Sequence, residues 1–362
     1  MEKLEIFLVV APGLEEVAAL EAREQGFARA RVVPGGVVCR GAWPEVWRAN
    51  LVLRIPGRVL VRLATFRAMS FRALEAGLDA VDWPAVLAPG QPVRAEAATK
   101  HSKLYHAGAV KGRLEQAVQR AGAVVDPDGL RVLVRIEDNA CVVSVDSSGE
   151  ALHRRGFKEA VNAAPMRETM AAGFLRAAGY AGREAVLDPM CGSGTFCIEA
   201  AEIAAGLAPG RGRAFAFEGF GSFDGAAFAQ MKDRAPVARG EGPVIGSDRD
   251  AGAVRMSREN AERAGVDCRF EEVALGALER PDCAPGLVIC NPPYGSRIGN
   301  KGPLFGLYGS FGKVMKERFG GWRVAMVTSE EKLARATGLP WQPPGPHVAH
   351  GGLKVRLWMA QL

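Results

Sequence analysis

Asp188-Pro189-Met190-Cys191-Gly192-Ser193-Gly194-Thr195 is the stretch of sequence that decides the fold. The apolar residues 185–187 directly before it predict a buried strand, and the apolar spacing over residues 196–206 predicts a helix. Glycines in such a turn let the backbone approach a ligand closely, at the carboxyl edge of a parallel sheet where ligands bind. The segment therefore predicts an α/β domain with a ligand site at this turn.

Strands and helices alternate from this turn to the end of the chain. Further strands are expected at residues 243–246, 268–270, 287–290, 323–328 and 353–362, and further helices at residues 251–264 and 304–319. This alternation is typical of a parallel, doubly wound sheet. We predict that residues 166–362 form this Rossmann-like domain.

The first half of the chain has a different order of elements. A strand at residues 4–10, a helix at 14–25, a hairpin at 32–39 and a helix at 43–53 predict a small α+β unit. Strands at 59–66, 93–98, 132–136 and 141–145, with helices at 71–78 and 111–121, predict a second α+β layer. A basic connector follows at residues 153–165.

Composition excludes some classes of protein. A chain of 362 residues exceeds what one core usually organises, so several domains are expected. It has no apolar run of about 18 residues, which argues against a membrane span, and its acidic first residues are unlike a signal peptide, which predicts a cytoplasmic protein. The net charge of +6 suits a polyanionic partner but is also common in arginine-rich proteins.

The seven cysteines are scattered, without a CxxC pair or a neighbouring histidine at metal-binding spacing. They are expected to be reduced, mostly buried thiols, with neither a metal site nor a disulfide framework.

The glycine-rich turn predicts a nucleoside ligand other than a dinucleotide. The third position of the dinucleotide fingerprint is Cys197 rather than Gly or Ala, which argues against NAD or FAD. The carboxylate of Asp188 suits an ammonium group better than a pyrophosphate, and Asp248, at the end of the second strand, suits ribose hydroxyls. Asp250 is better explained as a helix N-cap. The predicted cofactor-binding residues are Asp188, Pro189, Met190, Cys191, Gly192, Gly194, Thr195, Asp248 and Arg249.

Asn291-Pro292-Pro293-Tyr294 directly follows the fourth strand. Two prolines fix the backbone and remove N–H donors, so the Asn291 side-chain oxygen and the Pro292 carbonyl can both accept hydrogen bonds from one planar amine. Two acceptors raise the electron density on a poorly nucleophilic aromatic amine and aim it at a methyl donor. Tyr294 offers a face on which an extruded base can stack. We predict that Asn291, Pro292, Pro293 and Tyr294 carry the chemistry, without a metal or a covalent nucleophile.

These motifs, in this order, resemble those of the amino-methylating class I methyltransferases. Further stretches resemble THUMP-domain RNA methyltransferases: His153-Arg154-Arg155-Gly156-Phe157-Lys158, Ala164-Pro165-Met166-Arg167-Glu168-Thr169, Ala208-Pro209-Gly210-Arg211-Gly212 and Phe319-Gly320-Gly321-Trp322. Nearly the whole chain is similar to the bacterial guanine-N2 methyltransferase group that acts on 23S ribosomal RNA.

The resemblance implies a domain order and an activity. It implies a ferredoxin-like domain at 1–60, an RNA-binding THUMP domain at 61–152, a basic linker at 153–165 and a class I methyltransferase domain at 166–362. It implies transfer of a methyl group from S-adenosylmethionine to N2 of a guanosine in ribosomal RNA. A guanosine-N2 methyltransferase of transfer RNA, an adenine-N6 methyltransferase and an RNA-binding factor without catalysis are the alternatives.

Basic residues are candidates for contacts with RNA phosphates. Those in the predicted THUMP domain, the linker and the segment after the first methyltransferase helix are Lys100, Lys103, Lys111, Arg154, Arg155, Lys158, Arg211 and Arg213. Residues 211–217 mix basic and aromatic side chains, which suits base stacking but equally suits the packing of a long loop.

One position departs from the family pattern. Many relatives have an aspartate after the third strand that binds the adenine amine of the cofactor, and Ala274 stands at that position here. Adenine recognition is then expected to use backbone groups or Glu272.

Overall fold

The computed structural model describes residues 4–159, 166–234, 236–294 and 302–362, so residues 160–165 of the predicted linker lie outside the described residues. The chain forms two compact units. Within the described residues, unit 1 comprises residues 4–10, 18–152 and 213–234, and unit 2 comprises residues 11–17 and 153–212 and those from 236 onward.

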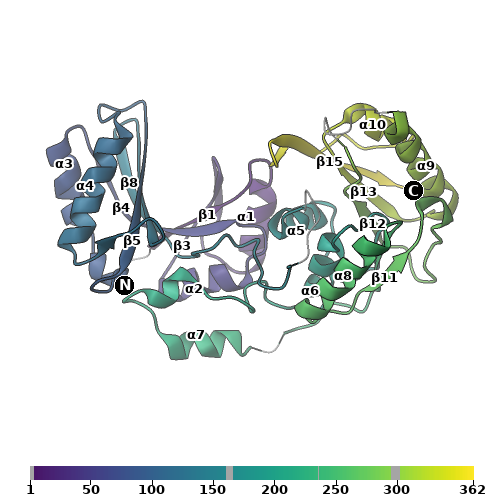
Figure 1. The fold of residues 1–362 in the computed structure, drawn as a ribbon, viewed down its shortest axis with the longest axis horizontal. Coiled ribbons are helices and arrows are strands. Elements are labelled where there is room, and N and C mark those ends of the chain that lie inside the picture. Colours follow the sequence, from purple (N-terminus) through teal and green to yellow (C-terminus); the bar gives the residue numbers. More distant parts are fainter. Residues whose placement is uncertain (1–3, 160–165, 235, 295–301) are drawn as a thin grey trace. The chain divides into compact units, whose positions relative to one another are not determined.

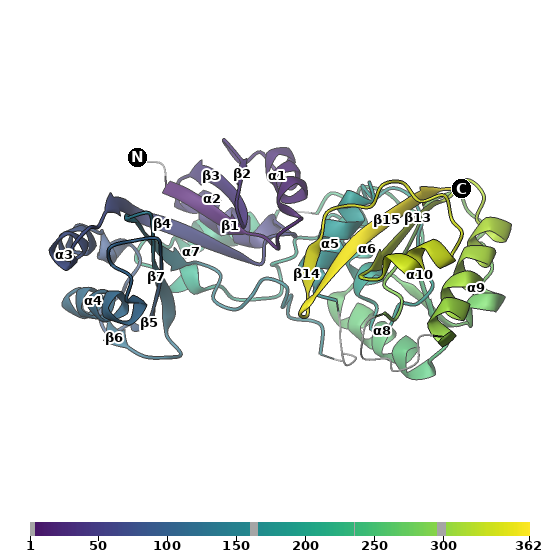
Figure 2. The ribbon, with the colours of Figure 1, turned by 90° about the horizontal axis from the view of Figure 1, so that it is seen from above.

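Unit 1 contains an eight-stranded sheet in the order β2-β3-β1-β4-β8-β7-β5-β6. Helices α3 and α4 pack side by side and against this sheet (Figures 1 and 2). The strands are β1 (Leu4–Val9), β2 (Arg31–Val33), β3 (Gly36–Gly41), β4 (Arg58–Arg67), β5 (Pro92–Lys100), β6 (Val124–Val125), β7 (Leu130–Glu137) and β8 (Ala140–Asp146). The helices of this half of the chain are α1 (Glu15–Glu24), α2 (Trp43–Val52), α3 (Phe71–Asp79) and α4 (Ala107–Arg120).

The sheet of unit 1 is continuous, whereas the sequence predicted two separate layers. Strand β4 pairs with β1 through Leu60 and Phe7, and with β8 through Val61 and Val145. The expected boundary between residues 60 and 61 therefore lies inside β4. The expected ferredoxin-like and THUMP segments share one sheet, because β4 pairs with β1 of the first segment on one side and with β8 of the second on the other.

Residues 213–234 also belong to unit 1, although we expected them in the methyltransferase domain. The Phe217 ring is fully buried, lies 5.1 Å from the Phe215 ring and packs edge-on against Phe228 of α7 (Gly225–Lys232). Trp47 of α2 also stacks with Phe217, with ring centroids 6.4 Å apart. The aromatic residues in 211–217 thus form a buried cluster, and the base-stacking interpretation of this segment is wrong.

Unit 2 contains a seven-stranded sheet in the order β11-β10-β9-β12-β13-β15-β14, which confirms the doubly wound fold. The strands are β9 (Val186–Asp188), β10 (Val244–Asp248), β11 (Arg269–Glu272), β12 (Leu287–Cys290), β13 (Arg323–Thr328), β14 (Val348–His350) and β15 (Leu353–Gln361). The first five strands of this sheet are parallel, and β15 is antiparallel to β13 and β14.

The helices of unit 2 form two groups (Figures 1 and 2). One group packs together and contains α5 (Glu168–Ala177), α6 (Thr195–Ala204) and α8 (Ala251–Ala264); the other contains α9 (Gly302–Arg318) and α10 (Glu331–Ala336). The sequence did not predict α5, α7, α10 or β14. None of the described helices is long and apolar enough to cross a membrane.

Helix α9 packs closely against the chain beyond α10. Phe311 and Trp322 are fully buried in the core between α9 and the sheet. A Cβ atom added at Gly312 of α9 would lie only 1.8 Å from the Thr337 carbonyl oxygen, whereas one added at the exposed Gly306 of the same helix would meet nothing. The small size of Gly312 is therefore required by a backbone contact.

We expect Gly312→Ala to destabilise the protein by about 1–3 kcal/mol, because the backbone of Thr337 must move to admit the methyl group. Gly306→Ala is the matched control, and we expect it to stabilise the protein by about 0.5–1 kcal/mol, since alanine favours the helix. Urea unfolding of the two variants measures both changes. Equal stability of the two variants would contradict the close packing of α9.

Candidate functional site

The strand order of unit 2 brings the predicted motifs to one edge of the sheet. Strand β9 lies between β10 and β12: Asp188 is opposite Gly246, and Leu187 is opposite Val288. Because the three strands are parallel, their carboxyl ends meet at the same edge. Asp188, Asp248 and Asn291 each lie at or directly after one of these ends. The structure therefore brings to one site three motifs that together span about 100 residues of the sequence.

The glycine-rich turn is held in a conformation that needs glycine. Gly192 has φ 57° and Gly194 has φ 81°, in the left-handed region that favours glycine. A Cβ atom on Gly194 would also lie 3.1 Å from Ser257 Oγ and 3.2 Å from the Phe270 ring. The Cys191 amide donates to the Ser247 carbonyl at 3.0 Å, which ties the turn to β10.

Asp188 is a buried carboxylate with a single hydrogen bond from the described residues, from the Met190 amide to its Oδ1 at 3.1 Å. Burial raises the pKa of Asp188 to about 8; the Met190 amide opposes the rise, and the nearby Asp248 charge adds to it. A buried carboxylate with this pKa is stabilised in its charged form by an incoming cation. The position thus suits an ammonium group.

Asp248 shapes the turn as well as the sheet edge. Its Oδ2 accepts a hydrogen bond from the Gly192 amide at 3.1 Å, and its Oδ1 accepts one from the Asp250 amide at 3.1 Å. Asp250 caps α8 by accepting from the Gly252 amide at 2.8 Å, as the sequence predicted. Arg249 is exposed between the two aspartates. Both Asp248 oxygens retain a lone pair for a ligand hydroxyl.

Two side chains of α8 that the sequence analysis missed hold the carbonyls of the turn. Ser257 Oγ donates to the Gly192 carbonyl at 2.9 Å, and Asn260 Nδ2 donates to the Ser193 carbonyl at 3.1 Å. Both side chains are fully buried. The sequence could have indicated them, because they are polar residues three positions apart on the apolar face of a helix. Buried polar side chains at such positions need hydrogen-bond partners.

Asn291 lies directly after β12, with its side-chain oxygen buried. Oδ1 has no hydrogen-bond partner among the residues that the structure describes. Pro292 is buried and Pro293 is exposed, while Tyr294 is partly buried and packs with Met190 against the core. Burial raises the pKa of Tyr294 to about 12, so the phenol is neutral at physiological pH. A buried acceptor without a donor is costly, which suits a site that receives a donor from a ligand.

Tyr308 of α9, also missed from the sequence, holds the second proline of this motif. Its hydroxyl has one proton and two acceptors within reach, the Pro293 carbonyl at 3.3 Å and Thr328 Oγ1 at 3.4 Å. Tyr308 is 1% exposed, so its ring is fixed by the core. The Pro293 carbonyl thus lies within reach of a donor, whereas Asn291 Oδ1 has none among the described residues.

Four of the predicted RNA-contact residues have structural partners. Arg155 is 2% exposed and pairs with buried Glu199 at 3.0 Å, and Lys158 pairs with Glu168 at 3.2 Å. Arg211 pairs with Glu202 at 2.5 Å, and Arg213 donates to the carbonyls of Glu150 and Ala151, each at 2.8 Å. Burial of Arg155 and Lys158 corrects the prediction for these two residues, whereas Arg211 and Arg213 are partly exposed and their contact with RNA stays a prediction.

The other basic candidates are exposed. Lys100, Lys103 and Lys111 lie in unit 1, and Arg154 lies in the connector. Lys100 pairs with Glu137 at 2.8 Å and Lys111 with Glu115 at 3.4 Å, both at the surface where such pairs are weak. Their role in binding RNA stays a prediction.

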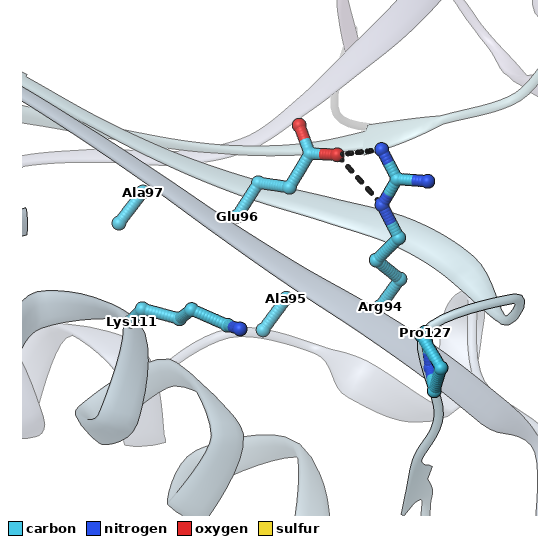
Figure 3. Close-up of a pocket in the computed structure, with 6 residues that line it drawn as sticks. All are labelled: Arg94, Ala95, Glu96, Ala97, Lys111 and Pro127. Atoms are coloured by element: carbon cyan, nitrogen blue, oxygen red, sulfur yellow. Dashed lines mark hydrogen bonds and ion pairs between the residues drawn. The ribbon is translucent and has the colours of Figure 1, made fainter. Parts of the chain in front are cut away.

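Lys111 lines a pocket of about 530 Å³ on β5 and α4 (Figure 3). The Arg94 guanidinium in this pocket is bound to the Glu96 carboxylate. Hydrogen bonds from Arg131 and, less strongly, Arg94 lower the pKa of Glu96 to about 2, so it stays ionised. The remaining lining residues are Ala95, Ala97 and Pro127. Glu96 offsets one of the two cations, which leaves this pocket only weakly basic.

The cysteines match the expectation of reduced, mostly buried thiols. All seven are free, and Cys268 and Cys283 are the two that are not fully buried. Within the described ranges, no group of three or more His, Cys, Asp or Glu residues could hold a metal ion.

Comparison with known proteins matches two segments of the chain to families. A family described as the RMKL-like methyltransferase domain matches residues 155–341, and one described as the RlmL ferredoxin-like domain matches residues 5–60. The first match contains all three motifs of the sheet edge. The second ends inside β4.

Relatives and solved structures agree with these families. A candidate RNA methyltransferase of Synechocystis sp. is 31% identical over 98% of this chain and 96% of its own length. The ribosomal RNA large subunit methyltransferase K/L of Syntrophotalea carbinolica is 34% identical over 92% of this chain. The chain spans about half the length of this K/L relative.

Two crystal structures match nearly the whole chain. SMU.472, a candidate methyltransferase complexed with SAH, has a TM-score of 0.88 and 25% identity, over 100% of this chain and 98% of its own. A predicted N6-adenine-specific DNA methylase of Listeria monocytogenes has a TM-score of 0.86 and 26% identity, over 99% of this chain and 96% of its own. The chain belongs to the RMKL-like methyltransferase family.

Proposed function

We propose that the protein transfers a methyl group from S-adenosylmethionine to the exocyclic N2 amine of a guanosine in RNA, with 23S ribosomal RNA as the preferred substrate. The observation that carries the proposal is the buried Asn291 Oδ1, which has no hydrogen-bond partner among the described residues and lies at the same sheet edge as Asp188. The name of the K/L relative supports ribosomal RNA, and a ribosomal RNA substrate implies a cytoplasmic location.

The residues of the sheet edge fit S-adenosylmethionine. The buried Asp188 carboxylate would hold the ammonium group of the methionine moiety, and Asp248 the ribose hydroxyls. When bound, the cofactor supplies an electrophilic methyl group on a sulfonium. After β11, Ala274 precedes a 3₁₀ turn and Glu272 is exposed, so neither supplies a buried carboxylate for the adenine amine. Backbone groups or the exposed Glu272 would make that contact.

The Asn-Pro-Pro-Tyr segment would activate the target amine by position. Asn291 Oδ1 and the Pro292 carbonyl accept the two amine hydrogens, which raises the electron density on nitrogen and directs its lone pair. The same two oxygens stabilise the positive charge that nitrogen gains as the methyl group arrives. The Tyr294 ring, neutral and held against the core, offers a stacking face for the base.

An adenine N6 amine would fit the same two acceptors, since both amines are planar and carry two hydrogens. The name of the Listeria monocytogenes structure supports this second candidate. The ferredoxin-like match at residues 5–60 favours ribosomal RNA, because it is the module described for the RlmL proteins. Guanosine N2 in transfer RNA is the third candidate.

We expect labelled S-adenosylmethionine to give N2-methylguanosine when the protein acts on undermodified 23S ribosomal RNA that is then digested to nucleosides. Transfer RNA and DNA serve as competing substrates in parallel reactions. Asn291→Ala should lower kcat about 10²- to 10³-fold without changing cofactor affinity, because the removed acceptor acts on the amine alone. Label in N6-methyladenosine from DNA would overturn the proposal, and label in transfer RNA guanosine would replace the preferred substrate.

Asp188 predicts a pH dependence for cofactor binding. The cofactor's ammonium favours the ionised carboxylate, and the pKa of Asp188 in the free protein is about 8, so binding must release a proton at lower pH. Affinity should therefore rise by up to about tenfold per pH unit below pH 8 and level off above it. Asp188→Asn should bind more weakly and lose this slope, as isothermal titration from pH 6 to 9 would show. Titration of the cofactor's own amine is common to both proteins, so parallel pH curves would contradict the role of Asp188.

We expect Tyr308→Phe to lower kcat about 3- to 10-fold, because the Pro293 carbonyl loses its donor. This decrease corresponds to the loss of one hydrogen bond, which contributes about 0.5–1.5 kcal/mol. Cofactor affinity should not change. Thr328→Val is the control, since it leaves the Tyr308 hydroxyl and Pro293 in place; its effect on kcat should be smaller. An equal loss of kcat in both variants would assign the effect to general loosening of this part of the core.

A further inference from the structure

The connector residue Lys158 contacts Thr195, the first residue of α6. Thr195 directly follows the glycine-rich turn at residues 192–194, called the cofactor turn below. The Lys158 Nζ donates to Thr195 Oγ1 at 2.8 Å and to the Met166 carbonyl at 3.2 Å, and it forms an ion pair with Glu168 Oε1 at 3.2 Å. An ammonium group has three N–H donors, and three acceptors surround this one. The Lys158 side chain is only 8% exposed and that of Glu168 7%.

Stability alone does not account for this arrangement. A buried ion pair contributes little over an apolar replacement, because both charges lose their hydration. A cation is also unfavourable at a helix N-terminus, and Thr195 is the first residue of α6. Glu168 offsets this charge from the first turn of α5. What the network adds is a fixed position for Thr195.

Thr195 follows Gly194, whose left-handed conformation ends the cofactor turn. The turn is held from β10 by the Ser247 carbonyl and from α8 by Ser257 and Asn260. Its junction with α6 receives a side-chain hydrogen bond from Lys158. A shift of Thr195 would move Gly194 with it, and with Gly194 the backbone that must approach the cofactor.

We propose that Lys158 is a positioning residue for S-adenosylmethionine: by its hydrogen bond to Thr195 it fixes the start of α6 and the adjoining Gly192–Gly194 turn. The proposal rests on the proposed function only in requiring that this turn bind the cofactor. It also gives a reason for a lysine in the connector, where the sequence suggested contact with RNA.

A second buried ion pair joins the same connector to α6 and provides a control. Arg155 Nε lies 3.0 Å from Glu199 Oε1, with exposures of 2% and 0%. Glu199 is four residues after Thr195, one turn further along α6. Both pairs are buried and begin in the connector, but Glu168 lies in α5 and Glu199 in α6. Lys158 also donates a hydrogen bond to Thr195, the first residue of α6.

The test compares Lys158→Met and Arg155→Met in cofactor affinity and melting temperature, with isothermal titration of S-adenosylhomocysteine and the KM and kcat of the methylation assay. We expect Lys158→Met to raise Kd and the KM for the cofactor at least tenfold, with kcat at saturating cofactor within twofold. Arg155→Met should lower Tm at least as much and change Kd less than twofold. Thr195→Val should weaken binding in the same direction, and adding it to Lys158→Met should cost nothing further, because both remove one hydrogen bond.

Unchanged cofactor affinity in Lys158→Met would overturn the proposal, as would an equal rise in Kd in Arg155→Met. If Lys158→Met does not fold, Thr195→Val decides the matter, since it removes the hydrogen bond but keeps the Lys158–Glu168 pair; normal affinity of that variant would overturn the proposal. Failure of the unmodified protein to bind the cofactor would overturn the proposed function together with the inference. Binding by the unmodified protein with no effect of either change at Lys158 or Thr195 would overturn the inference alone.

Discussion

The parallel pairing of β9 with β10 on one side and β12 on the other is the constraint on which the site depends. At or directly after the strand ends lie a buried carboxylate, Asp188; a partly exposed one, Asp248; and an amide, Asn291, whose Oδ1 has no partner among the described residues. Burying Asp188 and Asn291 Oδ1 is unfavourable, and a ligand that brings a cation to the first and a donor to the second would offset both costs. The strand order places these two groups at one edge of the sheet.

The residues around this edge donate hydrogen bonds to backbone carbonyls and, from Lys158, to the Thr195 hydroxyl. Ser257 and Asn260 hold turn carbonyls, Tyr308 reaches the Pro293 carbonyl, and Lys158 reaches Thr195. Such contacts fix the positions of the turn and of the Asn-Pro-Pro-Tyr segment without occupying Asn291 Oδ1. Preorganisation of this kind matters most for a reaction that depends on alignment, as transfer of a methyl group to a weak nucleophile does.

Much of the methyltransferase sheet could be predicted from the sequence, because its buried strands are short apolar runs and its helices have clear spacing. The limits of α8, β12 and β13 were predicted to the residue. Helices α5 and α10 were missed; α5 follows a proline in a segment whose alanines give little periodic contrast. The supporting residues were missed for a different reason: a buried lysine or tyrosine reveals its partner only when distant segments are brought together.

The N-terminal half shows a different limit. Local patterns predicted its elements well, yet they could not show that β4 continues one sheet through both expected domains, because strand pairing is not a local property. Arg155, Lys158, Arg211 and Arg213 had the composition of an RNA-binding surface but are held by carboxylates and carbonyls within the protein. A basic residue in a sequence indicates a positive charge but does not show which group that charge binds.

Because residues 213–234 pack in unit 1 while residues 153–212 and those from 236 onward belong to unit 2, neither unit is a continuous piece of chain. Cleaving the chain near residue 153 would take Phe217 and Phe228 away from Trp47 and leave apolar rings facing water on both fragments. Neither unit can therefore be replaced by exchanging one continuous segment of the chain. Recombination with a related protein could exchange one unit intact only by joining the chain at several points, which favours inheritance of the whole as a single module.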